Sequence, residues 1–412
     1  MSGADTRTSI PPTPPTPKPS TGVDSDSFFC TTSLGLVPIA VPPDGVCDYV
    51  FFDSLYTNND FKFIDSAPTG ELLTFLTAAK DTRRTEYGCG INVRYTSDAR
   101  SHLRMRPEDC TNFIQALISS NIIAFGILSI NKNQFSDATV FGRAVSLLSE
   151  LKAFLLNVLG RDDLFTLIGI YISGLETKDA MTKTFNAVKA PDVIIGLGHI
   201  AYVTSNMTNC EMLPHSTYNN TKKSQQLRAK YGSLYDLPTK VADMAKLMQD
   251  VQGPVWAVAS TLSARVYEPS FNHTLYTSCN RKDEQYNTPV TGCDGIDFNA
   301  LTRGIPLPFE PLSGLEGARI FDGIKHKFYV FDNTESLVRK YCKARVELPG
   351  LKFGVAAYDV NYDNGVSNSI LCPADKTKIG DFVRVQIMRK MRDGFRNQVF
   401  GDVDECITAI GP

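Results

Sequence analysis

The chain has 412 residues, of which 42% are hydrophobic and 21% charged, and its formal charge at pH 7 is −2. This composition is that of an ordinary globular protein and excludes a wholly disordered, collagen-like or coiled-coil chain. The near-neutral charge gives no reason to expect nucleic acid or an anionic membrane as a partner. The longest apolar stretch, Ile122 to Ile130, is about half of what a bilayer requires, so we expect no transmembrane segment.

The N-terminal segment is rich in proline and threonine and cannot form a core. Six prolines fall between Pro11 and Pro19, interleaved with Thr13 and Thr16. We interpret residues 1–27 as a disordered, extended and semi-rigid stalk whose hydroxyls could carry O-glycans. Residues 1–20 contain no apolar signal-peptide core, so we expect a chain that has been processed or truncated. A cytosolic protein with a disordered tail is the alternative.

Residues 28–412 alternate short apolar runs with amphipathic helical patterns. The patterns predict strands at Tyr49–Asp53, Gly90–Tyr95, Ile122–Ile130, Thr166–Ile172, Val193–Leu197, Val255–Leu262 and Lys352–Tyr358. They predict helices at Glu71–Ala79, Pro107–Ser119, Val140–Val158, Thr239–Asp250, Ser336–Ala344 and Phe382–Met391. Strands and helices alternating in this way favour a closed α/β barrel, interrupted by a less regular, cysteine-containing insert at about 268–318.

Cysteines and glycosylation motifs indicate the compartment. Ten cysteines occur without any CxxC spacing, and the five histidines lie far apart, so we expect neither a metal nor a cofactor. Three N-x-[ST] motifs begin at Asn206, Asn219 and Asn272, each in a polar stretch where a glycan could be accommodated. Together these features favour an oxidising, secretory setting over buried free thiols in a cytosolic enzyme.

Several stretches resemble family 18 glycoside hydrolases, the chitinase family. Residues 328–344 and 354–363 resemble the family's last helix and last strand, and residues 260–267 resemble its seventh strand. Cys30 and residues 47–52 resemble its first two strands. Because these motifs occur in the family's order, the resemblance implies a (β/α)8 TIM barrel over residues 28–412, with the 268–318 insert as a small α+β subdomain. Secreted proteins of ticks and other arthropods are the members that the chain most resembles.

The resemblance and the short intervening loop together imply a disulfide between Cys30 and Cys47. A second pair, Cys342–Cys372, would tie the helix at 336–344 to the loop after the last strand. The partners of the remaining cysteines stay open: these are Cys89, Cys110, Cys210, Cys279, Cys293 and Cys406.

The catalytic acids of the family are missing from the matching strand. In family 18 the motif D-x-x-D-x-D-x-E supplies a glutamic acid that protonates the leaving oxygen and an aspartate that orients the substrate's acetamido group. Here its acidic positions fall on Ala124, Ile127, Ser129 and Asn131, and no Asp or Glu occurs between Cys110 and Asp137. We therefore expect a secreted, catalytically inactive chitinase-like protein that binds a glycan or an extracellular protein.

A ligand is expected at the carboxyl ends of the barrel strands, where barrel proteins place their functional groups. The candidate ligand-binding residues are Asp53, Arg94, Ser129, Asn131, Arg265 and Tyr358. Arg265 matches the family's seventh-strand arginine, and Tyr358 takes the place of its last-strand tryptophan. The two arginines favour an acidic sugar or an acidic protein patch.

Alternative functions and an alternative interface are also consistent with the sequence. An active glycoside hydrolase on N-acetylglucosamine-containing polymers could use Asp53, Glu176 or Asp363 as its acids. A stalked structural or adhesive protein is a third possibility, supported only by the Pro/Thr-rich segment. Arg265 and Tyr358 could also simply fill the barrel end, with the 268–318 insert as the true interface.

Overall fold

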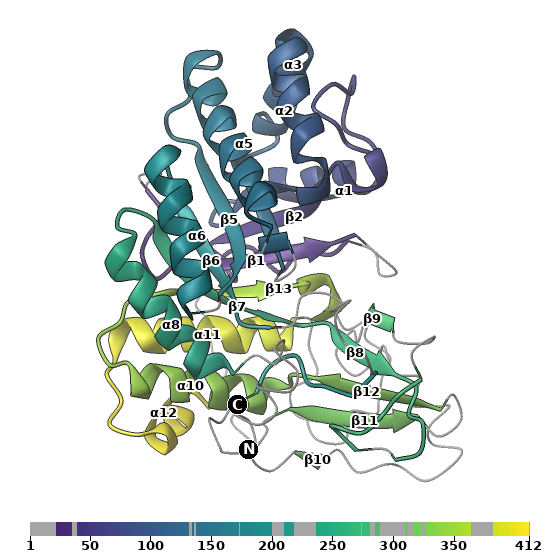
Figure 1. The fold of residues 1–412 in the computed structure, drawn as a ribbon, viewed down its shortest axis with the longest axis vertical. Helices are drawn as coiled ribbons and strands as arrows, with labels where there is room; N and C mark the ends of the chain where they lie inside the picture. The colour runs from purple at the N-terminus through teal and green to yellow at the C-terminus, as the bar shows by residue number, and fades with distance from the viewer. Residues whose placement is uncertain are drawn as a thin grey trace, which may run out of the picture.

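A closed barrel of eight parallel strands forms the body of the protein (Figure 1). The computed structural model describes residues 22–34, 39–131, 134–135, 137–172, 174–199, 210–217, 236–272, 274–280, 285–288, 310–311, 317–322, 326–363 and 382–411. Around the barrel the strands follow the order β1-β13-β7-β6-β5-β4-β3-β2. The predicted (β/α)8 TIM barrel is therefore confirmed.

The barrel strands are short and mostly buried. They are β1 (Phe28–Ser33), β2 (Tyr49–Leu55), β3 (Glu86–Ile91), β4 (Ile122–Ile130), β5 (Phe165–Tyr171), β6 (Val193–Leu197), β7 (Val255–Thr261) and β13 (Gly354–Tyr358). Every neighbouring pair is parallel, including β1 with β13, where Phe28 lies opposite Val355. All carboxyl ends of the strands consequently lie at one end of the barrel, which we call the mouth.

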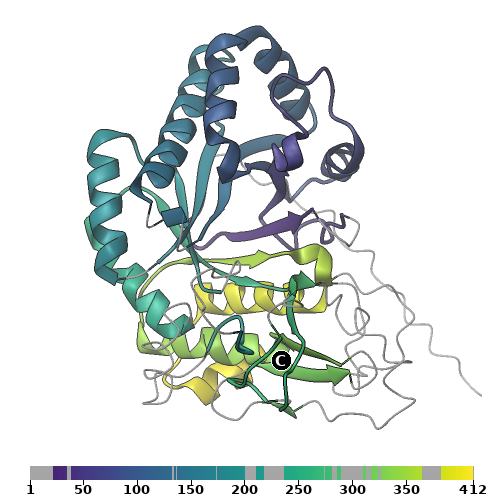
Figure 2. The ribbon, with the colours of Figure 1, turned by 45° about the vertical axis from the view of Figure 1, so that its right-hand side comes forward.

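Helices cover the outside of the barrel (Figures 1 and 2). They are α1 (Gly70–Lys80), α2 (Thr96–Met105), α3 (Pro107–Ile118), α5 (Ala138–Asn157), α6 (Gly174–Ala187), α8 (Leu237–Asp250), α10 (Thr334–Glu347), α11 (Val383–Asn397) and α12 (Val403–Ile410). Local sequence sets their starts. Asp137, for example, caps α5 by accepting the backbone N–H of Thr139 at 2.9 Å.

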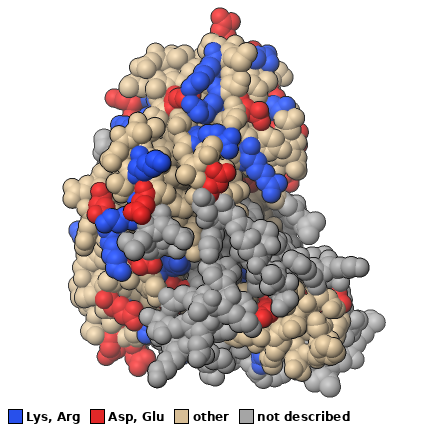
Figure 3. Space-filling view, in the orientation of Figure 1, with Lys and Arg blue, Asp and Glu red and all other residues tan. Residues whose placement is uncertain are grey.

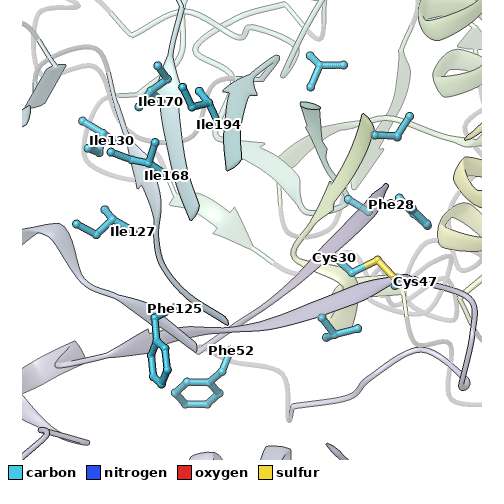
Figure 4. Close-up of a cluster of buried hydrophobic side chains, with 14 of the residues drawn as sticks. Phe28, Cys30, Cys47, Phe52, Phe125, Ile127, Ile130, Ile168, Ile170 and Ile194 are labelled. Atoms are coloured by element: carbon cyan, nitrogen blue, oxygen red, sulfur yellow. A yellow bond between two sulfur atoms is a disulfide. The ribbon is translucent and has the colours of Figure 1, made fainter. Parts of the chain in front are cut away.

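Alternate residues of each strand build two separate apolar layers. The inner layer fills the barrel with side chains such as Phe51, Leu128 and Leu167. The outer layer packs strand residues such as Ile127 and Ile168 against the helices, and Figure 4 shows these isoleucines on β4 and β5. Because both faces of the strands are buried, their sequences are nearly continuous apolar runs.

A second sheet lies beside the barrel, between β7 and α10 in the chain (Figure 1). It has the order β10-β11-β12-β8-β9, from strands β8 (Ala264–Tyr267), β9 (Gln285–Thr288), β10 (Glu310–Pro311), β11 (Ala318–Asp322) and β12 (Lys327–Phe331). The insert expected at about 268–318 is thus wider at both ends. Leu262 and Ser263 separate β7 from β8, and residues 264–267 pair within this second sheet and not within the barrel.

Two further boundaries differ from the prediction. The strand expected at Gly90–Tyr95 ends at Ile91, because residues Val93–Tyr95 form a 3₁₀ helix. The barrel's contacts also begin before Phe28, since Ser27 is fully buried and the backbone of Asp26 accepts a hydrogen bond from Arg392. Of the expected stalk, residues 1–21 lie outside the described residues.

Three disulfides occur among the described residues. Cys30–Cys47 is confirmed, with a Cα–Cα distance of 6.1 Å, and Figure 4 shows it beside the core. The proposed pair Cys342–Cys372 is wrong, because α12 lies against α10 and brings Cys406 to 5.7 Å from Cys342, measured between the Cα atoms. Cys210 pairs with Cys279.

The remaining cysteines and the sequons are placed as follows. Cys89 and Cys110 are buried free thiols, and Cys293 and Cys372 lie outside the described residues. Asn272 is exposed, as a glycan acceptor must be, whereas Asn206 and Asn219 lie outside the described residues.

No helix in the described part of the chain is long and apolar enough to cross a membrane. On the face drawn in Figure 3, basic and acidic side chains are interspersed.

A buried carboxylate, Asp48, ties the amino-terminal end of the barrel to α11. Its Oδ2 accepts the backbone N–H of Phe28 at 2.8 Å and a hydrogen bond from Arg392. Its Oδ1 accepts from Arg389 at 2.9 Å. Since Asp48 and Arg392 are both buried, each charge depends on the other for compensation.

We expect Asp48→Asn to lower the free energy of unfolding by about 3–5 kcal/mol, because it removes the buried counter-charge of Arg392 and leaves that guanidinium only the half-exposed carboxylate of Asp393. Urea denaturation followed by circular dichroism measures the change. The matched control is Asp393→Asn, which also removes a carboxylate from Arg392 but a half-exposed one, and should cost less than about 1 kcal/mol. Equal losses in the two variants would contradict the assigned role of Asp48.

Candidate functional site

Tyr358, the last residue of β13, crosses the inside of the barrel at the mouth. Its hydroxyl donates a 2.6 Å hydrogen bond to the carbonyl of Leu128 on β4, on the other side of the barrel. Gly169 on β5 permits this crossing, because a Cβ there would lie 1.8 Å from the Leu128 carbonyl oxygen and 2.7 Å from the tyrosine hydroxyl. Tyr358 therefore forms the floor of the mouth.

Two carboxylates flank the end of β1 above this floor. Asp53 lies opposite Ser33 in the β1–β2 pairing, and Asp359 follows β13 on the other side of β1. Burial is the main cause that raises the pKa of Asp53 to about 7, and the negative charge of Asp359 adds to it, partly offset by a hydrogen bond from Ser54. The mouth thus holds a carboxyl group that titrates near neutral pH.

His199 and Thr261 complete this group of polar side chains. Thr261 donates a hydrogen bond of 2.5 Å to Asp359, and the His199 ring lies 5.3 Å from the Tyr358 ring, centroid to centroid. Burial lowers the pKa of His199, while the nearby charge of Asp359 acts in the opposite direction. We define the mouth cluster as Asp53, His199, Thr261, Tyr358 and Asp359.

Sequence reasoning found only Asp53 and Tyr358 of the mouth cluster. The signal for the other three was their position, since each lies at or within two residues of the end of a barrel strand. His199 stands alone in the sequence, without a second histidine at metal-ligand spacing. Asp359 falls at a position that the family motif leaves variable.

The inner face of β4 carries no acid. Ala124 and Leu128 belong to the inner apolar layer, whereas Ile127 packs in the outer layer against the helices. Of the positions aligned with the acidic motif, Ile127 thus faces the helices and not the inside of the barrel. A bulge between Ile127 and Ile130 also breaks the simple alternation of faces along this strand. Ser129 has a buried hydroxyl without a hydrogen-bond partner among the described residues.

Two other candidates lie at the mouth end but outside the cluster. Asn131 is engaged with Gln134: its carboxamide oxygen accepts the Gln134 backbone N–H at 3.0 Å, and Gln134 returns the same bond. Arg94 lies exposed on the 3₁₀ helix after β3. Asn131 is thus a loop-shaping residue here, while Arg94 is available to a ligand at the rim.

Arg265 does not lie at a barrel strand end. It is a residue of β8, only 2% exposed, and its Nε donates a 2.5 Å hydrogen bond to the Tyr267 hydroxyl. That hydroxyl in turn donates to the Leu213 carbonyl at 2.9 Å. Arg265 is therefore a buried residue of the second sheet, linked through the Tyr267 hydroxyl to Leu213, and presents almost no surface to a ligand.

The other acids weighed for catalysis are not in the mouth cluster. Asp363 is buried and bound to Arg384 at 2.7 Å and to the backbone N–H of Val385 at 3.0 Å, so it anchors the start of α11. Glu176 falls within α6, and its side chain lies outside the described residues. No group of three potential metal ligands occurs in the described part of the chain.

Comparison with known proteins establishes the fold class. No protein-family model and no curated protein sequence matches the chain. Human YKL-39, described as a pseudo-chitinase with retained chitooligosaccharide binding properties, matches with a TM-score of 0.59 at 11% identity, covering 90% of this chain and 100% of that chain. An immunomodulatory active chitinase from Trichuris suis matches with a TM-score of 0.55 at 10% identity, covering 89% and 99%. A chitinase-like agglutinin from Robinia pseudoacacia matches with a TM-score of 0.53 at 15% identity, covering 82% and 96%.

At these identities the likeness establishes the fold. The chain has the barrel fold of chitinases and chitinase-like proteins, as its motifs implied. The narrower resemblance to tick proteins stays a prediction.

The raised pKa of Asp53 predicts a pH dependence of stability. The folded state keeps the Asp53 proton up to about pH 7, whereas the unfolded chain loses it near pH 3.8. Ionisation of Asp53 therefore lowers the free energy of unfolding as the pH rises from about 4 to about 7. The shift corresponds to at most about 4 kcal/mol, reduced by the partial solvent contact of the side chain. When urea midpoints of unfolding are measured across this range, the midpoint of Asp53→Asn should rise relative to that of the unsubstituted chain as the pH rises. A constant difference at every pH would contradict the shift.

Proposed function

We propose that this protein is a secreted, catalytically inactive chitinase-like protein that binds a glycan or an extracellular protein at the barrel mouth. The observation that carries the proposal is the inner face of β4, where Ala124 and Leu128 leave no carboxyl group facing the inside of the barrel. General acid catalysis contributes roughly 10²–10⁴-fold to such reactions, so its loss alone removes most turnover. Binding does not require this acid.

The similar solved structures support the view that this barrel fold can bind sugars without catalysing their hydrolysis. One is described as a pseudo-chitinase that retains chitooligosaccharide binding, and another as an active chitinase. The same barrel thus serves both purposes, and the residues at the strand ends decide between them.

Secretion is supported by the disulfides and by one exposed sequon. Bridges of this kind form and persist in oxidising compartments. Cys30–Cys47, Cys210–Cys279 and Cys342–Cys406 are all formed, and Asn272 is exposed on the surface.

The charged groups at the mouth change the class of ligand that we expect. Arg94 and Arg265 favour an acidic ligand in the sequence analysis, but Arg265 lies buried in the second sheet. The mouth cluster itself holds the carboxyl groups of Asp53 and Asp359. We therefore expect a neutral N-acetylated or an amine-bearing sugar to bind more tightly than an acidic one.

A second candidate function rests on Asp53. A carboxyl group that holds its proton near pH 7 is what a glycosidase requires of its general acid. Asp53 lies on β2, however, and not on the strand where the family carries its acid. We retain an active glycoside hydrolase as the alternative, with Asp53 as the proton donor.

The test combines hydrolysis of a fluorogenic chitobioside with calorimetric titration of chitotetraose, its deacetylated form and an acidic oligosaccharide. We expect no hydrolysis above that of buffer, and binding of the first two ligands. Asp359→Asn should weaken binding of the deacetylated form by about tenfold, because a charge-assisted hydrogen bond is lost.

Asp393→Asn is the matched control, since it makes the same chemical change outside the mouth cluster. Turnover that disappears in Asp53→Asn would overturn the proposal and establish the hydrolase. Failure of every glycan to bind would leave a protein partner as the remaining form of the proposal, tested by pull-down with the Asp359→Asn variant as control.

A further inference from the structure

A cavity of about 220 Å³ lies at the end of the barrel opposite the mouth. It is bounded by residues 24–26 before β1, by the start of β13, and by the last turns of α10 and α11. Phe353 and Val355 line it at the amino-terminal end of β13, whereas Tyr358 of the mouth cluster ends that strand. The cavity is therefore separate from the candidate site already described.

Four cations and two carboxylates line this cavity: Arg345, Lys352, Arg392, Arg396, Asp24 and Asp26. Arg396 is neutralised within this set, since it contacts Asp26 at 2.9 Å and Asp24 at 3.6 Å. Arg392 is neutralised from behind by Asp48 and Asp393. Two positive charges, Arg345 and Lys352, remain without a carboxylate partner among the described residues.

Arg345 is the more constrained of these two cations. It donates to the carbonyls of Leu351 and Phe395, the second at 2.8 Å, which uses two of its five N–H donors. Burial lowers its pKa, and no neighbouring carboxylate acts against that effect. Capping α11 accounts for one of these bonds, but it does not use the remaining donors or account for Lys352 beside it.

The rest of the lining is apolar. Phe353, Val355 and Phe395 supply it, and the Arg345 guanidinium lies 5.8 Å from the centre of the Phe395 ring. The volume is below the roughly 300–1,000 Å³ of drug-sized ligand sites, so only a compact molecule fits.

We propose that this cavity binds a small organic anion, with a carboxylate or similar oxyanion held by Arg345 and Lys352 and a compact apolar body against Phe353 and Phe395. The planar fork of a guanidinium suits a carboxylate, and an ammonium beside it adds a second charge-assisted contact. The site is independent of any sugar binding at the mouth.

The test uses the full chain with benzoate as probe, followed by calorimetry and by thermal unfolding. Benzoate should bind saturably and raise the melting temperature, while the neutral analogue benzyl alcohol should not. Lys352→Gln should weaken benzoate binding about tenfold, and Arg345→Gln by at least as much. The control is Lys246→Gln, which removes a cation that is 76% exposed on α8 and should leave binding unchanged.

Several results would contradict anion binding in this cavity. Equal binding of benzoate and benzyl alcohol, unchanged affinity in Lys352→Gln, or no saturable binding would each overturn the proposal. Because Lys352 is exposed, its variant keeps the test valid even if Arg345→Gln fails to fold. Inorganic sulfate serves as a further arm, and binding as tight as that of benzoate would contradict the role assigned to the two phenylalanines.

Discussion

The closure of the barrel between its first and last strands is the constraint on which the rest of the structure depends. β13 follows the second sheet in the chain and must still pair with β1, which lies more than 300 residues earlier in the sequence. Gly354 makes the approach possible, because a Cβ there would lie 2.4 Å from the Ser27 carbonyl oxygen. Asn361 then fixes the other end of the pair by bonding both the N–H and the carbonyl of Ser33.

Closure also assembles the mouth cluster. Asp359 is held beside β1 by its backbone N–H, which donates to the Thr31 hydroxyl at 3.2 Å. Tyr358 reaches β4 only because β13 has taken its place in the ring of strands. The polar groups at the mouth are thus held in place by the same contacts that close the barrel.

Much of the fold could be predicted from the sequence, because its strands are buried on both faces and its helices carry clear start signals. Ile122–Ile130 and Val193–Leu197 have the bounds that their apolar runs predicted. The second sheet is harder to predict from the sequence. β8 follows β7 after a gap of only two residues, and its apolar pattern resembles a continuation of β7. That short gap is also why Arg265 was expected at the mouth.

The candidate site was less predictable, because it depends on which strand ends meet across the barrel. Tyr358 and Asp53 could be found from their strand positions, but their partners are set by the order of the strands. His199 is brought beside Tyr358 by the adjacency of β6, β7 and β13, which the pattern of apolar runs does not contain. The Cys342–Cys406 bridge depended in the same way on α12 returning to α10, which spacing alone could not indicate.

That bridge has a consequence for how the chain behaves when it is cut. Cys342 and Cys406 enclose β13 and α11, so the strand that closes the barrel lies inside a covalent loop. A protease that cleaves once within this loop would leave both fragments joined, and the product would migrate as one species on a gel until a reductant is added. The closing strand would therefore stay tethered to its neighbours, at high effective concentration, after its backbone had been severed.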